Sequence, residues 1–260
     1  MNQKPKILVL DIETAPIVAN VWKIWKENIG LSQIKSDWHL LAFSAKWLGD
    51  STNKIIYMDQ RNAKDIEDDT KLLKKAWDLI YSADILITHN GINFDLKKLN
   101  TRFLLKGFKP LPDIKHVDTL RLARKHFSFT SNKLAFLTDK LCTKYKKLQH
   151  KNFAGFELWK ECLNGNKKAW KEMEKYNKYD VLSLEELYNI LSPWDNSINN
   201  NLYREDHGIV CQCGSKHFHR EGYRFTRVGK YQRFRCRECG RWTQSRCNSF
   251  SQEKRQSLRT

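Results

Sequence analysis

The sequence lacks any hydrophobic run long enough to cross a membrane, which argues against a membrane-spanning protein. At the amino terminus only four apolar residues precede the first acid of ILVLDIET, too few for a signal peptide. No amphipathic basic helix or lipidation signal favours an anionic membrane surface. We therefore expect a cytoplasmic chain, in which seven cysteines indicate metal binding or free thiols more than disulfides.

Acidic residues are also scarce relative to basic ones. The 260 residues include 47 lysines and arginines against 29 aspartates and glutamates, a formal net charge of +18. Such a surplus indicates a polyanionic partner, most often nucleic acid. A hydrophobic fraction of 40% and an aromatic fraction of 12% favour a folded chain over a disordered one.

Arginine is rare in the first 202 residues, where lysine supplies most of the positive charge. From Tyr203 onward the bias reverses, with eleven arginines against three lysines. The segment between the two regimes is rich in asparagine and has no apolar periodicity, which is typical of a linker. We therefore predict a large domain, a linker, a small module and a disordered polar tail, over residues 1–194, 195–208, 209–250 and 251–260.

The large domain is predicted to be α/β. The stretch KILVLDIE is apolar on both faces, as in the central strand of a sheet. Further strands follow it, and helical segments then alternate with short strands before a helical C-terminal part. This order predicts a mixed sheet flanked by helices.

Two carboxylates in the first strand are the first candidates for a site. Asp11 and Glu13 are two residues apart, so both point to the same face of the strand. Two acids on one side of a buried strand are costly unless a cation compensates them. Carboxylates suit hard cations such as Mg²⁺ or Mn²⁺. The alternative is a strand that simply ends in a polar turn.

Two further carboxylates lie far along the chain. Asp180 falls within the apolar stripe of a predicted helix, with Tyr176 one turn earlier on the same face. Asp95 ends the loop HNGINFD, which follows an apolar strand, where active-site loops of open sheets lie. Solvent exposure at the edge of the stripe is the alternative for Asp180, and capping of the next helix is the alternative for Asp95.

The segments LVLDIET, NGINFD and YNKYD together resemble the three motifs of the DEDD exonucleases, which have an RNase H-like fold. The resemblance covers about residues 5–191. The Tyr-xxx-Asp spacing of the third motif is similar to the tyrosine subclass, as in polymerase proofreading domains. It implies hydrolysis of single-stranded DNA from its 3′ end, to nucleoside monophosphates, with two Mg²⁺ or Mn²⁺ ions.

The resemblance also implies roles for individual residues. Tyr176 would orient the attacking water. Asn90, Asn93 and Phe94 would grip the terminal nucleotide. Asp118, in HVDTL, either supports the site or is a polar residue that ends a strand. The metal ligands would be Asp11, Glu13, Asp95 and Asp180.

The small module carries two close cysteine pairs that resemble a zinc ribbon. Four thiolates around one structural Zn²⁺ would fold a segment too small to fold on its own core. The first pair departs from the usual pattern because it is Cys-x-Cys, which leaves His217 or His219 as a substitute ligand. We expect Cys247 to be spare and Cys142 and Cys162 to be core thiols. The four predicted ligands are Cys211, Cys213, Cys236 and Cys239.

Between the cysteine pairs, arginines interleave with aromatic residues. Alternation along strands would give a cationic, partly aromatic surface suited to phosphates and stacked bases. A solvated charged face, with the aromatics filling the core, is the alternative. The predicted contacts are Arg224, Arg227, Arg233 and Arg235.

The sequence therefore predicts a metal-dependent 3′–5′ exonuclease with a fused nucleic-acid-binding module. One alternative is an RNase H-like endonuclease acting on branched DNA or on an RNA strand. Another is a non-catalytic nucleic-acid-binding protein, although none of the four acids is missing. A free-standing nuclease of this kind would suit a phage or mobile element, in which case the expected location is the host cytoplasm.

Overall fold

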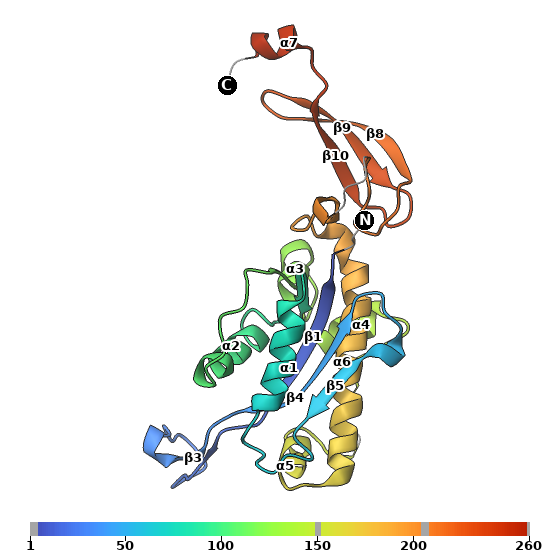
Figure 1. The fold of residues 1–260 in the computed structure, drawn as a ribbon. Coiled ribbons are helices and arrows are strands. Elements are labelled where there is room, and N and C mark those ends of the chain that lie inside the picture. Colours follow the sequence, from blue (N-terminus) through green and yellow to red (C-terminus); the bar gives the residue numbers. More distant parts are fainter. Residues whose placement is uncertain (1–4, 149–151, 204–207, 259–260) are drawn as a thin grey trace. The chain divides into compact units, whose positions relative to one another are not determined.

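The computed structural model describes residues 5–148, 152–203 and 208–258, which belong to two compact units (Figure 1). The N-terminal unit is Lys6–Ile190, and the C-terminal unit begins at Leu191. Within the described ranges, no helix combines the length and hydrophobicity that crossing a bilayer requires.

The N-terminal unit is built on a five-stranded mixed sheet of order β5-β4-β1-β6-β7. The central strand, β1 (Ile7–Thr14), pairs antiparallel with β4 (Leu40–Trp47) and parallel with β6 (Ile85–Thr88). At the edges, β5 (Ile56–Asp59) is antiparallel to β4, and β7 (Lys115–Asp118) is parallel to β6. The predicted α/β class, with an RNase H-like mixed sheet, is confirmed.

Helices flank this sheet on both sides. They are α1 (Thr70–Tyr81), α2 (Asp95–Leu105), α3 (Thr119–His126), α4 (Leu134–Leu141), α5 (Glu157–Leu163) and α6 (Lys167–Leu191). Leu8, Leu10 and Ile12 of β1 share a buried core with α1 and α2. A second core joins Leu41 and Ala42 of β4 to α5 and α6. The odd-numbered residues of β1 point away from the first core, because successive strand residues face opposite sides.

One segment of this unit was not predicted. After β1, the short strands β2 (Val18–Ala19) and β3 (Ile34–Ser36) pair antiparallel. They close a hairpin that projects from the sheet (Figure 1). We call residues 17–36 the hairpin arm.

The C-terminal unit contains a three-stranded antiparallel sheet of β8 (Phe218–Phe225), β9 (Lys230–Cys236) and β10 (Trp242–Asn248). This β-rich region with clustered cysteines agrees with the predicted fold class. Its core is small: beyond Leu191, the buried hydrophobic residues among those described are Ile198, Val210, Cys211 and Cys236.

The segments on either side of this sheet have more structure than we expected. The predicted linker, 195–208, includes the 3-10 helix η4 (Asn200–Tyr203), and Arg241 donates to the carbonyl of Asp195. The predicted disordered tail, 251–260, instead contains α7 (Gln252–Ser257). That helix forms because Ser251 caps it, its hydroxyl accepting from the amide of Lys254 at 3.2 Å.

Candidate metal and nucleic-acid sites

Three of the four predicted carboxylates meet on one face of β1. Asp11 and Glu13 point toward α5 and α6, and Asp180 enters from α6. One oxygen from each of the three lies within 4.8 Å of the other two. Asp180 is only 1% exposed, and Asp11 and Glu13 are half-buried. Convergent carboxylate oxygens are the ligands that a hard divalent cation takes.

Asp95 approaches the same strand from the other direction. It is the first residue of α2, and Phe94 occupies the N-cap position. The carboxylate of Asp95 accepts from the amide of Ile12 at 3.2 Å, between the two acids of β1. Asp95 lies outside the 4.8 Å group, yet its charge raises the pKa of Asp11. Asp95 therefore lies at the edge of the cluster formed by Asp11, Glu13 and Asp180.

Burial raises the pKa of all four acids, and repulsion by neighbouring acids adds to it for Asp11, Glu13 and Asp95. Burial is the largest cause in each case, and it raises the pKa of Asp11 well above its usual range. Burial and the charge of Asp180 raise the pKa of Glu13 to about 8. The pKa of Asp95 rises to about 7, and that of Asp180 is also raised. Four such groups cannot all be ionised near neutral pH without added positive charge.

Lys147 supplies one such charge. Its ammonium lies 2.5 Å from Oδ2 of Asp180 and 4.4 Å from the centre of the Tyr176 ring. Burial opposes the ammonium form, but the charges of Asp180 and Asp11 raise the pKa of Lys147 above its usual range. The other oxygen of Asp180, Oδ1, is buried and has no hydrogen-bond partner among the described residues. A buried carboxylate oxygen without a partner, beside the Lys147 ammonium, fits a site that also binds a metal ion.

Two donors, the buried Asn177 and the half-buried Trp159, hold the acids of β1 in place. Nδ2 of Asn177 donates to Oδ2 of Asp11 at 2.6 Å. Nε1 of Trp159 donates to Oε2 of Glu13 at 3.1 Å, and its ring meets that of Tyr176 edge-on, with centroids 6.3 Å apart. Sequence reasoning missed these residues and Lys147. Only Asn177 left a signal, since it lies three residues before Asp180 on the same helix face.

The loop between β6 and α2 carries the residues predicted to grip a nucleotide. Asn90 has a left-handed φ of 68°, uncommon for a residue with a side chain and often found at functional sites. Its carbonyl oxygen Oδ1 lies 3.4 Å from Nδ2 of Asn93. Phe94 is 39% exposed and therefore accessible to a ligand.

Asp118, at the end of β7, holds this loop by hydrogen bonds. Its carboxylate accepts from the amides of Asn90 at 2.9 Å and Ile92 at 3.2 Å. It also ends β7 and caps α3, accepting from the amide of Leu120 at 3.0 Å. Asp118 therefore ends a strand, as the sequence allowed, and also holds the loop that carries Asn90. The loop also requires glycine at position 91, because a Cβ there would lie 2.1 Å from Oγ1 of Thr88.

The four cysteines predicted as ligands come together in the C-terminal unit. The sulfurs of Cys211 and Cys239 lie 3.4 Å apart, and those of Cys213 and Cys236 lie 3.6 Å apart. Four thiolates around a tetrahedral zinc ion would be about 3.8 Å apart, given Zn–S bonds of about 2.3 Å. Among the described residues, no histidine belongs to this group, so neither His217 nor His219 replaces a cysteine.

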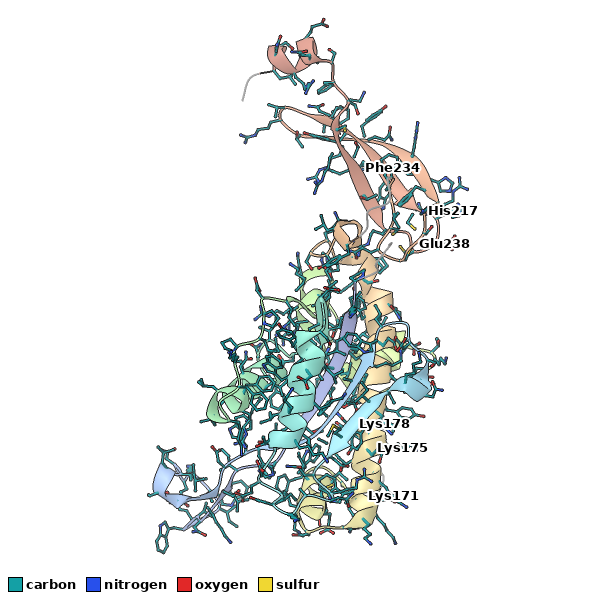
Figure 2. All side chains as sticks on the ribbon, viewed as in Figure 1. Lys171, Lys175, Lys178, His217, Phe234 and Glu238 are labelled. Atoms are coloured by element: carbon teal, nitrogen blue, oxygen red, sulfur yellow. The ribbon has the colours of Figure 1, made fainter. Side chains whose placement is uncertain are left out.

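The thiols outside the group are placed as expected. Cys142 and Cys162 are buried in the N-terminal unit, and burial raises the pKa of each to about 12. Cys247 is exposed. In contrast, the pKa of Cys236 falls to about 7, because hydrogen bonds from the amides of Cys239 and Glu238 outweigh its burial. Figure 2 labels Glu238 and His217 at the cysteine end of the sheet.

Three of the four predicted arginines share one face of the C-terminal sheet. Arg233 is directly opposite Gln244, and Arg235 is opposite Trp242. Arg224 joins the same face, since it donates to Oε1 of Gln244 at 3.2 Å. The guanidinium of Arg233 lies 4.5 Å from the centre of the Trp242 ring. The fourth, Arg227, is exposed in the turn between β8 and β9.

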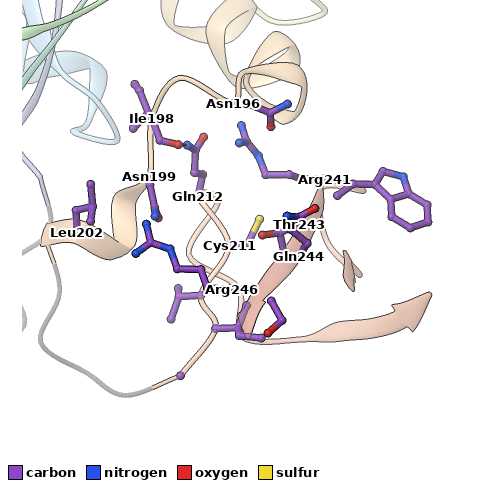
Figure 3. A pocket seen from close by; sticks show the side chains of 15 residues that line it. Asn196, Ile198, Asn199, Leu202, Cys211, Gln212, Arg241, Thr243, Gln244 and Arg246 are labelled. Atoms are coloured by element: carbon purple, nitrogen blue, oxygen red, sulfur yellow. Dashed lines mark hydrogen bonds between the residues drawn. The ribbon is translucent and has the colours of Figure 1, made fainter. Parts of the chain in front are cut away.

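Two pockets of the molecule add basic surface. In the C-terminal unit, a pocket lies between the 196–202 segment and β10 (Figure 3). It is lined by Arg241 and Arg246 and by no acid. In the N-terminal unit, Lys171, Lys175 and Lys178 follow one another along α6 (Figure 2) and line a groove that also contains Glu174, the ion-pair partner of Lys178. Neither pocket is lined by the three acids of the cluster or by Asp95.

Comparisons with known proteins agree with the fold. Residues 26–192 match the model of a family described as the RNase H superfamily. The PolC-type DNA polymerase III of Ureaplasma parvum serovar 3 is 38% identical over 81 residues, which are 31% of this chain and 5% of the polymerase. The family B DNA polymerase of Pyrobaculum calidifontis gives a TM-score of 0.48 at 12% identity, over 74% of this chain and 26% of that one. The chain thus spans a small part of each polymerase.

Proposed function

Because the chain belongs to the RNase H superfamily, we propose that it is a metal-dependent nuclease that removes nucleoside monophosphates from the 3′ end of single-stranded DNA. The observation that carries the proposal is the cluster of Asp11, Glu13 and Asp180, with oxygens within 4.8 Å of one another. The Tyr-xxx-Asp spacing on α6 supports the tyrosine subclass of DEDD exonucleases. The relative that shares 38% identity over 81 residues is a DNA polymerase, which favours DNA.

Each residue of the cluster has a defined task in this proposal. Asp11, Glu13, Asp95 and Asp180 would hold two Mg²⁺ or Mn²⁺ ions. Such ions activate water and stabilise the leaving oxygen in phosphodiester hydrolysis. Asn177 and Trp159 fix the orientation of two of these acids by their hydrogen bonds.

Tyr176 would position the attacking water without deprotonating it. Its hydroxyl forms a hydrogen bond with Asp180. Burial, together with the charge of Asp180, raises the pKa of Tyr176, so the phenol stays protonated at neutral pH. A neutral phenol can donate a hydrogen bond but is a poor base.

The C-terminal unit would hold the substrate. We propose that its four cysteines bind one structural Zn²⁺ and that the shared face of Arg224, Arg233 and Arg235 contacts phosphates. The guanidinium stacked on Trp242 resembles the surfaces that bind single strands without reading sequence. The lysine row of α6 offers a second cationic surface.

The test uses oligonucleotides labelled at either end, in DNA and in RNA, with Mg²⁺ or Mn²⁺. We expect 5′-labelled DNA to give a metal-dependent ladder and 3′-labelled DNA to release a mononucleotide. Asp11→Ala and Asp180→Ala should abolish cleavage, whereas Asp139→Ala, a control at an exposed acid, should not. Cutting only within branched or hybrid duplexes would indicate the endonuclease. Binding without cleavage would indicate a non-catalytic protein.

A further inference from the structure

The hairpin arm exposes large apolar side chains that nothing in the described chain covers. Trp22 is 93% exposed and Trp25 is 81% exposed. An exposed patch of this kind marks an interaction site more often than a chance feature. Its other exposed members are Ile17, Val18, Val21, Ile24, Ile29 and Leu31.

Hydrogen bonds to a single acid, Glu27, organise the arm. The carboxylate of Glu27 accepts from the amides of Trp22 at 3.0 Å and Lys23 at 2.8 Å, and from Nε2 of Gln33 at 3.0 Å. Among residues 20–30, Glu27 is the only one that is not exposed. The hydrogen bonds from Lys23, Gln33 and Trp22 lower the pKa of Glu27. A fixed ionised centre thus holds the rings outward, where they face solvent.

The arm is also cationic. Lys23, Lys26 and Lys35 lie within it, and Glu27 is its single acid. The charge of Glu27 is engaged by backbone amides, which leaves the lysines to face a partner. Lys26 has a left-handed φ of 56°, a conformation that costs free energy in a residue with a Cβ and is often retained at functional sites.

We propose that the hairpin arm is a stacking platform for single-stranded nucleic acid. Bases would lie on the rings of Trp22 and Trp25, and phosphates would lie against Lys23 and Lys26. Aromatic rings alternating with cations are the chemistry that binds single strands of any sequence. The charges favour a polyanion over a second protein surface. This inference rests on the proposed function for its class of substrate.

The position of the arm suits a strand bound at the carboxylate cluster. The arm begins at Ile17, four residues after Glu13, and both belong to the N-terminal unit. A strand long enough to contact both would be held at two places, whereas a dinucleotide in the cluster would contact only one. The arm should therefore increase the affinity for long strands and leave short ones unaffected.

The test compares three double variants of the full chain: Trp22→Phe/Trp25→Phe, Trp22→Leu/Trp25→Leu and Trp22→Ala/Trp25→Ala. Binding of a fluorescent oligothymidylate of 30 nucleotides is followed by anisotropy in the Asp11→Ala background, so that no cleavage occurs and no chelator removes zinc. We expect the Phe pair to bind within about threefold of wild type. The Leu and Ala pairs should bind about 30-fold more weakly, the lower end of what stacking of two bases contributes. Leu104→Ala, at an exposed apolar residue of α2, is the matched control.

Three results would overturn the inference. If the Leu pair bound like wild type, apolar contact and not stacking would explain the exposed rings. If the Ala pair bound like wild type, or if the tryptophans instead held two copies of the chain together in sedimentation, the arm would serve another purpose. Thermal melting checks that all variants fold. Loss of cleavage in Asp11→Ala with arm-dependent binding retained separates this inference from the proposed nuclease activity.

Discussion

The ammonium of Lys147 forms an ion pair with Asp180, with Nζ 2.5 Å from Oδ2. Asp180 is buried, and the lysine side chain is 23% exposed. The pair places a positive charge where Asp11, Glu13 and Asp180 converge, so it offsets part of their repulsion. Lys147 therefore offsets the charge of the same acids that would hold a divalent cation.

Replacing Lys147 tests this relationship. Lys147→Met should reduce the free energy of unfolding in EDTA by about 1–3 kcal/mol or more, because it leaves the buried Asp180 without its partner. Added Mn²⁺ should restore more stability to this variant than to wild type. Thermal melting with and without the ion measures both effects. Lys140→Met is the control, since that lysine pairs with Asp139 on the surface at 3.8 Å, and it should change stability little.

The hydrogen bond from Asn177 to Asp11 predicts an effect on metal dependence. Asn177→Ala should raise the Mn²⁺ concentration needed for half-maximal cleavage by about 10–100-fold, the usual effect of removing a group that orients a ligand. Trp159→Phe should act in the same direction through Glu13 while keeping an aromatic ring. Titration of the nuclease activity with metal measures the shift. An unchanged metal dependence in both variants, with Asn164→Ala as a surface control, would contradict these roles.

The raised pKa of Glu13 predicts how stability depends on pH without metal. The pKa is 4.5 in the unfolded chain and about 8 in the folded one, so between these values the folded state retains a proton that the unfolded state releases. The contribution of Glu13 to the free energy of unfolding is therefore fully present below about pH 4.5 and is lost as pH rises toward 8. Asp95, with a pKa of about 7, acts in the same direction.

Melting temperatures in EDTA between pH 5 and 8 check this prediction. We expect them to fall as pH rises, and Glu13→Gln should flatten the decline because the amide does not titrate. Mg²⁺ or Mn²⁺ should raise the melting temperature more at pH 8 than at pH 5, since the ions bind the ionised carboxylates. A melting temperature that rises with pH in EDTA would show that these acids are ionised without metal.

The cysteine cluster predicts that zinc holds the C-terminal unit folded. Elemental analysis should find one Zn²⁺ per chain. A strong chelator should expose the region after residue 208 to proteolysis while the N-terminal unit stays intact, because few hydrophobic residues are buried there. Cys236→Ser should have the same effect as the chelator. Cys247→Ser, at an exposed cysteine outside the cluster, should leave zinc content and protease resistance unchanged.

The elements that the sequence predicted well have strong internal periodicity. The helix expected to carry Asp180 extends over Lys167–Leu191, and its apolar stripe is buried as the spacing required. The hairpin arm was missed because its large apolar residues face solvent. Periodicity reports burial, so a segment whose large apolar residues are exposed gives a misleading pattern.

The sequence by itself determined the local arrangement of the site: two acids on one strand face, a third acid one helical turn beyond a tyrosine, and two cysteine pairs. These follow from the fixed periods of strands and helices. Only the tertiary structure decided that Lys147, Asn177 and Trp159 contact those acids. Contacts between residues far apart in the chain depend on how elements pack, and no local spacing records them.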